Sequence, residues 1–209
     1  MAAPGATARR SAKHTDGRVL RGARNHALIV QALYDLIRAG NVQPTAEQVA
    51  ARAGVGTRTV FRQFEDVETL YRSLGERLQV EVMALVELTP ATGRLADDLR
   101  TIIGRRAKIY EHLTPFRRAG RVVRHTSAFL QRQDAEIAAI LRGALEAIVG
   151  PRLAPDAGDT LEALDLLLSF EAWDRLRDAQ GLGVRRAEQV LVRATTTLAK
   201  RAARSRAAK

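Results

Sequence analysis

The chain contains no cysteine, so disulfide bonds and cysteine-ligated zinc sites are both excluded. It also has no uninterrupted apolar run near the ~20 residues that a membrane-spanning helix requires. No apolar stretch typical of a signal peptide follows the N-terminus. We therefore expect a protein that stays in the cytoplasm and does not enter a membrane.

Aromatic residues are scarce, at 4% of the chain, and there are only six prolines in 209 residues. Alanine, leucine and arginine dominate instead, and this composition favours helices over strands. Four of the prolines divide the C-terminal part into blocks of helical spacing, about 92–113, 115–125, 126–149, 158–179 and 184–203. No block shows sustained strand alternation. The sequence predicts an all-α protein of about nine helices.

Signatures of catalysis are also missing. The sequence has no glycine-rich phosphate loop, no cysteine nucleophile and no Gly-x-Ser-x-Gly motif, and its carboxylates are scattered along expected solvent faces. His112 and His125 lie in different blocks without acidic residues at metal-ligand spacing. We therefore expect a protein that is not an enzyme and that uses no cofactor or metal.

The net charge of +11 is concentrated at the N-terminal end. Residues 1–64 hold ten Lys and Arg against three acids, whereas the other 145 residues hold 24 against 20. Five of those 24 lie in the last ten residues, so the region between is nearly neutral. A basic module on a nearly neutral body is typical of a protein that binds a polyanion. The alternative is a charge excess that only keeps the protein soluble.

Residues 45–64, TAEQVAARAGVGTRTVFRQF, indicate two short helices joined by a tight turn. Thr45 follows a proline and can cap a first helix that begins at Ala46. Gly54 can take the left-handed conformation that ends this helix, and Val55 then points inward. This order of features is typical of a helix-turn-helix.

The second helix of this pair begins at Gly56 or Thr57 and has Val60 and Phe64 as its inward residues. Its outward side carries hydrogen-bond donors and no acid, through Thr57, Arg58, Thr59, Arg62 and Gln63. We interpret it as a DNA-reading helix. The alternative is an ordinary helical hairpin, which uses the same turn chemistry.

The segments around this motif suggest a domain plan. Residues 1–17 have few large apolar side chains and predict a disordered basic arm, which can lie along DNA or be a plain flexible terminus. A helix over about Arg18–Ala39 completes a DNA-binding domain over 18–65. A long helix then leads into a helical ligand-binding and dimerisation domain over 66–203, followed by a basic tail over 204–209.

The last two helical blocks differ from the others. Residues 161–180 are apolar on more than one face, and such a helix needs two packing partners. Together with the small-residue face of the final block, they predict a four-helix dimer interface with two helices from each subunit. The residues expected there are Leu164, Leu168, Val190, Leu191, Ala194 and Leu198. The alternative is burial in the core of one subunit.

Over about fifty residues the sequence resembles the TetR family of transcriptional regulators. The resemblance rests on Ile29, Ala32 and Gly40 and on AARAGVGTRTVFRQFEDVETLY, residues 50–71; FEAWDRLRDAQGL, residues 170–182, matches more loosely. Members are all-α homodimers with an N-terminal helix-turn-helix and a C-terminal domain that binds a small-molecule inducer, and most are repressors. The resemblance implies a homodimer on a palindromic double-stranded DNA operator and an unknown inducer.

Matched position by position, the residues that the resemblance places at the DNA are Thr45, Thr57, Arg58, Thr59, Phe61, Arg62 and Gln63. This chain departs from the family pattern where Phe61 replaces a usual tyrosine and Val67 replaces a common lysine, and each change removes a phosphate contact. Gln63 stands where histidine is frequent. Arg58 stands where a small glycine is common, and arginine can read guanine through two hydrogen bonds.

The resemblance also implies a ligand pocket among the middle helices. Large or mixed-polarity residues on expected inward faces are the candidates to line it: Met83, Ile103, Arg106, Tyr110, Phe129, Phe170 and Trp173. Arg106, one helical turn from Tyr110, can bind an anionic ligand; the alternatives are a surface arginine and aromatic residues of the core.

The resemblance therefore implies a sequence-specific DNA-binding transcriptional regulator that responds to a ligand and acts as a repressor. The alternative is a helical architectural or co-regulator protein that binds DNA without a small-molecule inducer.

Overall fold

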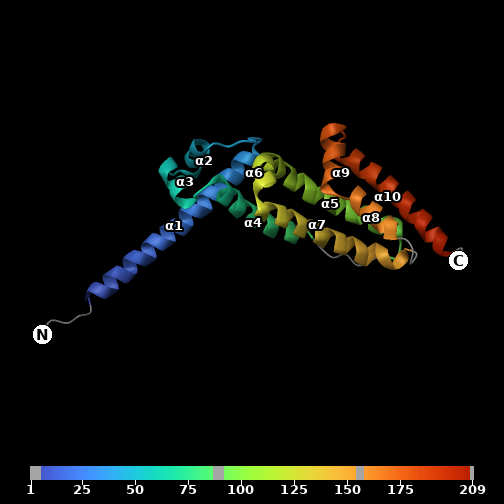
Figure 1. The fold of residues 1–209 in the computed structure, drawn as a ribbon, viewed down its shortest axis with the longest axis horizontal. Coiled ribbons are helices and arrows are strands. Elements are labelled where there is room, and N and C mark those ends of the chain that lie inside the picture. Colours follow the sequence, from blue (N-terminus) through green and yellow to red (C-terminus); the bar gives the residue numbers. More distant parts are fainter. Residues whose placement is uncertain (1–5, 87–91, 154–157, 208–209) are drawn as a thin grey trace. The chain divides into compact units, whose positions relative to one another are not determined.

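The computed structural model describes residues 6–86, 92–153 and 158–207 of the chain. Within these ranges it contains ten α-helices, one 3₁₀ turn, one π-helical turn and no strand (Figure 1). The predicted all-α fold class is confirmed. The helices are α1 (Ala6–Arg38), α2 (Ala46–Ala53), α3 (Thr57–Gln63), α4 (Val67–Leu85), α5 (Leu95–Ala119), α6 (Arg121–Thr126), α7 (Ala128–Val149), α8 (Gly158–Leu167), α9 (Phe170–Asp174) and α10 (Val184–Ala207); η1 (Gly150–Arg152) is the 3₁₀ turn and η2 (Arg175–Ala179) the π-helical turn.

The chain forms two compact units. The first comprises Met1–Glu76 and Pro115–Ser127, and the second comprises Arg77–Thr114 and Ala128–Lys209. The predicted plan had one boundary near residue 65, whereas the units divide inside α4 and inside α5. Two long helices therefore contribute residues to both units.

The first unit has an apolar core to which each of its main helices contributes. α1 supplies Ile29, Leu33 and Ile37, all buried, at the three- and four-residue spacing expected of one helix face. The other buried residues are Val49 and Ala50 of α2, Val60 of α3, Phe64, Leu70 and Leu74 of α4, and Phe116 of α5. Val67, the first residue of α4, is 60% exposed.

Helix α1 begins at Ala6, so the prediction of a disordered arm over residues 1–17 is wrong from Ala6 onward; residues 1–5 lie outside the described part. The segment is rich in alanine and arginine, which have high helix propensity, and no proline interrupts Ala6–Arg38. The helix therefore extends about twelve residues further toward the N-terminus than hydrophobic spacing alone predicts.

Helix α5 continues through Pro115, where the sequence predicted a break. The proline lacks an N–H and removes one backbone hydrogen bond, at a cost of about 3 kcal/mol or more. Leu113 and Phe116 on either side are buried, and burying a large apolar side chain contributes about 1.5–3 kcal/mol. The packing of these two residues offsets the missing bond.

The predicted helix over 158–179 is instead three elements, α8, α9 and η2. Ser169 separates the first two because its Oγ accepts a hydrogen bond from the backbone N–H of Ala172 and so starts α9 as an N-cap.

At the end of the chain, α10 runs to Ala207 and includes most of the predicted basic tail. The largest buried side chain of the second unit is Trp173, and Leu99, Ile103, Leu145 and Leu164 are buried in the same unit.

No helix in the described ranges is both long enough and apolar enough to cross a membrane.

Candidate functional site

Helix α2 is held at its start by a capping box, as the threonine before it predicts. The Thr45 hydroxyl oxygen accepts from the backbone N–H of Gln48 at 3.3 Å, and Gln48 Oε1 accepts from the backbone N–H of Thr45 at 2.9 Å. Asn41 Nδ2 also donates to Gln48 Oε1, at 2.9 Å. Hydrogen bonds from its own backbone N–H and from Thr45 hold the pKa of Glu47 below its usual range. Thr45 thus fixes the first helix of the pair and remains exposed.

The turn between α2 and α3 depends on Gly54. Its φ of 68° and ψ of 30° are left-handed, and the following Val55 N–H donates back to the Ala50 carbonyl at 3.0 Å. A β-carbon at Gly54 would meet no atom within 4 Å, so the backbone conformation and not the space selects glycine. Val55 is half-buried, so it packs inward only in part.

Helix α3 separates its residues into a buried side and an exposed side. Val60 and Phe64 are both 3% exposed, and the Phe64 ring lies 4.7 Å from the ring of His26 in α1. Arg58, Phe61 and Arg62 are exposed. The inward positions that the sequence predicts on this helix are therefore correct.

All six residues of α3 that are predicted to contact DNA have accessible surface. Arg58, Phe61 and Arg62 are exposed, and Thr57, Thr59 and Gln63 are half-buried. The helix contains no acid. Among the described residues neither Arg58 nor Arg62 forms an ion pair within the protein. Their cationic groups are available to an external anion.

Contacts from α1 fix where α3 and α2 lie within the first unit. Arg52 of α2 pairs with Asp35 of α1 at 3.1 Å. A β-carbon placed at Gly22 of α1 would lie 4.0 Å from the side-chain nitrogen of Gln63. At the start of α4, Asp66 Oδ1 accepts from Thr69 N at 2.7 Å, and this bond holds the pKa of Asp66 below its usual range. The ion pair thus holds α2 against α1, and the Asp66 bond caps the start of α4 directly after α3.

The residues predicted to line a ligand pocket have different environments. Ile103, Arg106, Tyr110 and Trp173 are buried, Phe129 and Phe170 are half-buried, and Met83 is 42% exposed. Met83 therefore does not face the interior of the second unit, contrary to expectation. Tyr110 forms ring contacts with Phe170 at 5.6 Å and Trp173 at 6.4 Å, as core aromatics do.

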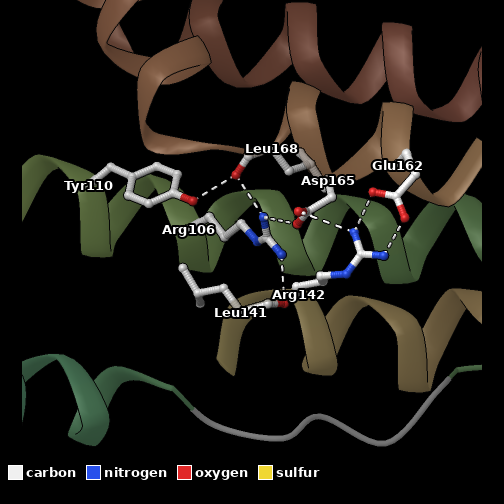
Figure 2. Close-up of polar contacts among 7 residues, drawn as sticks. All are labelled: Arg106, Tyr110, Leu141, Arg142, Glu162, Asp165 and Leu168. Atoms are coloured by element: carbon white, nitrogen blue, oxygen red, sulfur yellow. Dashed lines mark hydrogen bonds and ion pairs between the residues drawn. The ribbon is translucent and has the colours of Figure 1, made fainter. Parts of the chain in front are cut away.

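Arg106 is 4% exposed, so the alternative of a surface arginine is wrong (Figure 2). Its two terminal nitrogens donate to the backbone carbonyls of Leu168 and Leu141, each at 2.7 Å. Asp165 lies 3.8 Å away and also approaches Arg142, at 3.5 Å. The terminal nitrogens of Arg106 thus donate to groups of the protein itself. Arg142, which no sequence pattern indicated, pairs with Glu162 and Asp165 of α8.

The predicted dimer residues also divide into two groups. Leu164, Leu168 and Leu191 are buried within one subunit, so for these three the alternative of core burial is correct. Val190, Ala194 and Leu198 keep partial exposure on α10, and Leu166 of α8 is 71% exposed. A hollow of about 520 Å³ lies along α10 and is lined by Arg186, Gln189, Val190, Arg193 and Ala194. None of the seven predicted pocket residues lines it.

Comparisons with known proteins show which fold this arrangement of helices resembles. No protein-family model matches the chain, and no curated protein matches it. A crystal structure from Mesorhizobium loti at 1.54 Å resolution, provisionally described as a TetR-family transcriptional regulator, superposes on it with a TM-score of 0.58. The match covers 86% of this chain and 95% of that chain at 21% sequence identity. This chain has the TetR-regulator fold. The resemblance drawn from residues 29–71 and 170–182 is therefore confirmed as a likeness of fold.

Proposed function

We propose that the protein is a sequence-specific DNA-binding transcriptional regulator and that α3 reads the operator. The observation that carries this proposal is the exposed, acid-free side of α3, with Arg58 and Arg62 unpaired within the described residues and Val60 and Phe64 anchoring the opposite side. A TetR-regulator fold with such a helix is suited to the major groove of B-DNA, which admits an α-helix.

Most outward residues of α3 carry groups that can form hydrogen bonds with DNA. The planar guanidinium of Arg58 can donate two hydrogen bonds to guanine, and the Gln63 amide can donate to and accept from adenine. Thr57, Thr59 and the exposed Thr45 carry hydroxyls suited to phosphate oxygens. Phe61 offers only carbon atoms to the DNA.

The proposal includes a homodimer that binds a palindromic operator. The partly exposed Val190, Ala194 and Leu198 form an apolar strip on α10 beside a hollow that Arg186, Gln189 and Arg193 also line, and a second copy can pack onto this surface. Two-fold symmetry places the two α3 helices on half-sites about 34–36 Å apart, or further apart if the dimer is wide. Replacing Ala194 with glutamate is expected to give monomers in analytical ultracentrifugation.

We further propose that a small molecule binds the second unit and releases the DNA, as in a repressor. An architectural protein is the alternative, because it needs neither a pocket nor a defined operator. The half-buried Phe129 and Phe170 remain candidates to contact such a ligand.

Selection of genomic fragments with the purified protein at physiological salt, followed by footprinting, tests this function. We expect a protected palindrome that is bound at least 1000-fold more tightly than random DNA. Weak, salt-sensitive binding to every fragment would contradict the regulator and favour the architectural alternative.

A further inference from the structure

The N-terminal part of α1, residues 6–24, is strongly basic; we call it the basic extension. It contains six basic residues and one acid, Asp16: Arg9, Arg10, Lys13, Arg18, Arg21 and Arg24. The rest of α1, residues 25–38, has one acid and one arginine. The charge of α1 is therefore confined to one part of the helix.

The side chains of the basic extension that the structure describes, residues 19–24, pack little. Val19 and Leu20 are 64% and 70% exposed, and Arg21 and Arg24 are exposed as well. Among the described side chains of α1, the first buried one is that of Ile29. The core of the unit therefore does not account for the positive charges of Arg21 and Arg24.

Helical periodicity places the six basic positions on one side of α1. Successive residues of an α-helix are about 100° apart, so positions 9, 10, 13, 18, 21 and 24 fall within about 180°. The large buried residues Ile29, Leu33 and Ile37 fall in the opposite half of the circumference, and the small buried Ala32 falls in the basic half. The basic positions therefore share one half of the circumference, and these three large residues of the core occupy the other half.

The basic extension begins beside α3. A β-carbon placed at Gly22 of α1 would lie 4.0 Å from the Gln63 side-chain nitrogen, so the two helices are close at this point. From there α1 continues toward Ala6 for sixteen residues, about 24 Å. Figure 1 shows this part of α1 projecting beyond α3. A DNA duplex read by α3 would therefore pass within reach of the extension.

We propose that the basic extension binds DNA phosphates next to the bases that α3 reads. This inference rests on the proposed function, because it needs DNA at α3. Duplex DNA carries one negative charge per about 1.7 Å of its length, and each phosphate that a Lys or Arg neutralises releases counterions. A 24 Å basic helix face therefore gains affinity that depends on salt.

Binding also stabilises the extension itself. An isolated helix of this length is only marginally stable in water, and like charges one turn apart, such as Arg21 and Arg24, repel each other. Phosphates remove that repulsion. Because phosphate contacts read no base, they strengthen binding to operator and random DNA alike.

The test compares two full-length variants that lose four charges each. The extension variant is R9Q/R10Q/K13Q/R18Q, and the matched control is K200Q/R201Q/R204Q/R206Q in α10. The dissociation constants for the selected operator and for a random duplex are measured by fluorescence anisotropy. The salt concentration is varied about sixfold, from about 50 to about 300 mM. Circular dichroism of the free proteins checks that both variants remain folded.

We expect the extension variant to lower the slope of log Kd against log salt by about two to four, on operator and random DNA alike, and to shorten the footprint at its ends. The control should keep the wild-type slope. An unchanged slope in the extension variant, or an equal loss in the control, overturns the inference while the operator binding of the wild type leaves the proposed function intact. Failure of the wild type to select any DNA would overturn both.

Discussion

The guanidinium of Arg106 and the backbone carbonyl of Leu168 are joined by a buried hydrogen bond of 2.7 Å (Figure 2). Leu168 directly follows α8, and the last carbonyls of a helix have no N–H partner within it. The Tyr110 hydroxyl donates to the same oxygen at 2.7 Å. Arg106 therefore places a positive charge at the negative end of the α8 dipole and joins α5 to α7 and α8.

Replacing Arg106 with methionine should destabilise the protein by roughly 2–4 kcal/mol, because it removes two buried charge-assisted hydrogen bonds and the positive charge beside Asp165. Urea unfolding measures this change. R100M is the matched control, since the Arg100 side chain is 63% exposed and its pair with Asp97 is worth about 0–1 kcal/mol. Equal stabilities for R106M and R100M would contradict the structural role of Arg106.

Replacement by alanine is expected to destabilise the protein at Gly54 and to stabilise it at Gly104. Both have open space where a β-carbon would lie. Gly54→Ala should cost about 1–2 kcal/mol of unfolding free energy, because alanine is disfavoured at its φ of 68°. Gly104→Ala lies inside α5 and should instead gain about 0.5–1 kcal/mol. Thermal unfolding of the two variants gives the signs, and a stable G54A would show that the turn is not left-handed in solution.

The helix-turn-helix could be predicted in detail because all its signals are local. The cap at Thr45, the turn at Gly54 and the inward residues Val60 and Phe64 lie within twenty consecutive residues, and each depends on backbone chemistry or helical spacing. The same local rules fail for α5, because whether a helix continues through Pro115 depends on what Leu113 and Phe116 pack against.

The candidate pocket shows the same limit. Periodicity placed Arg106 on an inward face correctly, but its partners Leu141 and Leu168 lie 35 and 62 residues away. Backbone carbonyls carry no sequence signal, so their hydrogen bonds to an arginine cannot be read from residue types. The role of Arg106 in supporting a helix end could therefore not be predicted from the sequence.

Asp98 gives a prediction for pH. Hydrogen bonds from the Thr92 N–H, at 2.8 Å, and from Arg152 hold the pKa of this 4% exposed carboxyl below its usual range. A carboxyl whose pKa is lowered by folding stabilises the protein above its unfolded pKa of about 3.9, and that contribution is lost as the pH falls through the folded value. D98N should therefore be less stable than wild type at pH 7.

The urea unfolding midpoints of wild type and D98N, measured from pH 7 down to about pH 2.5, check this expectation. This pH range includes the ordinary pKa of a carboxyl group. The two midpoints should converge as the pH falls below about 4. D97N is the control, because Asp97 is half exposed and bonds the neighbouring exposed Arg100. A gap between wild type and D98N that stays constant with pH would assign the loss to packing.

Arg58 is expected to read a base, and two substitutions separate that role from charge alone. Arg58→Ala should weaken operator binding by roughly 1–3 kcal/mol and relax the preference at one position in each half-site. Arg58→Lys keeps the charge but lacks the planar fork, so it should lose the same preference while it retains binding to random DNA. Anisotropy titrations on operators changed one base pair at a time measure both effects. A lysine variant with wild-type base preference would show that Arg58 contacts only phosphate.

Phe61→Tyr restores the hydroxyl that TetR-family regulators usually have at this position. Phe61 is 64% exposed, so the added oxygen stays in water in the free protein and stability should change by less than about 0.5 kcal/mol. With DNA bound, the hydroxyl can donate to a phosphate, which should strengthen operator binding by roughly 0.5–1.5 kcal/mol, or about twofold to tenfold. Phe64→Tyr is the control, because Phe64 is buried and the same oxygen there should destabilise the fold by roughly 1–3 kcal/mol. If F61Y binds the operator no more tightly than wild type, α3 approaches the DNA at a different angle from the one the fold implies.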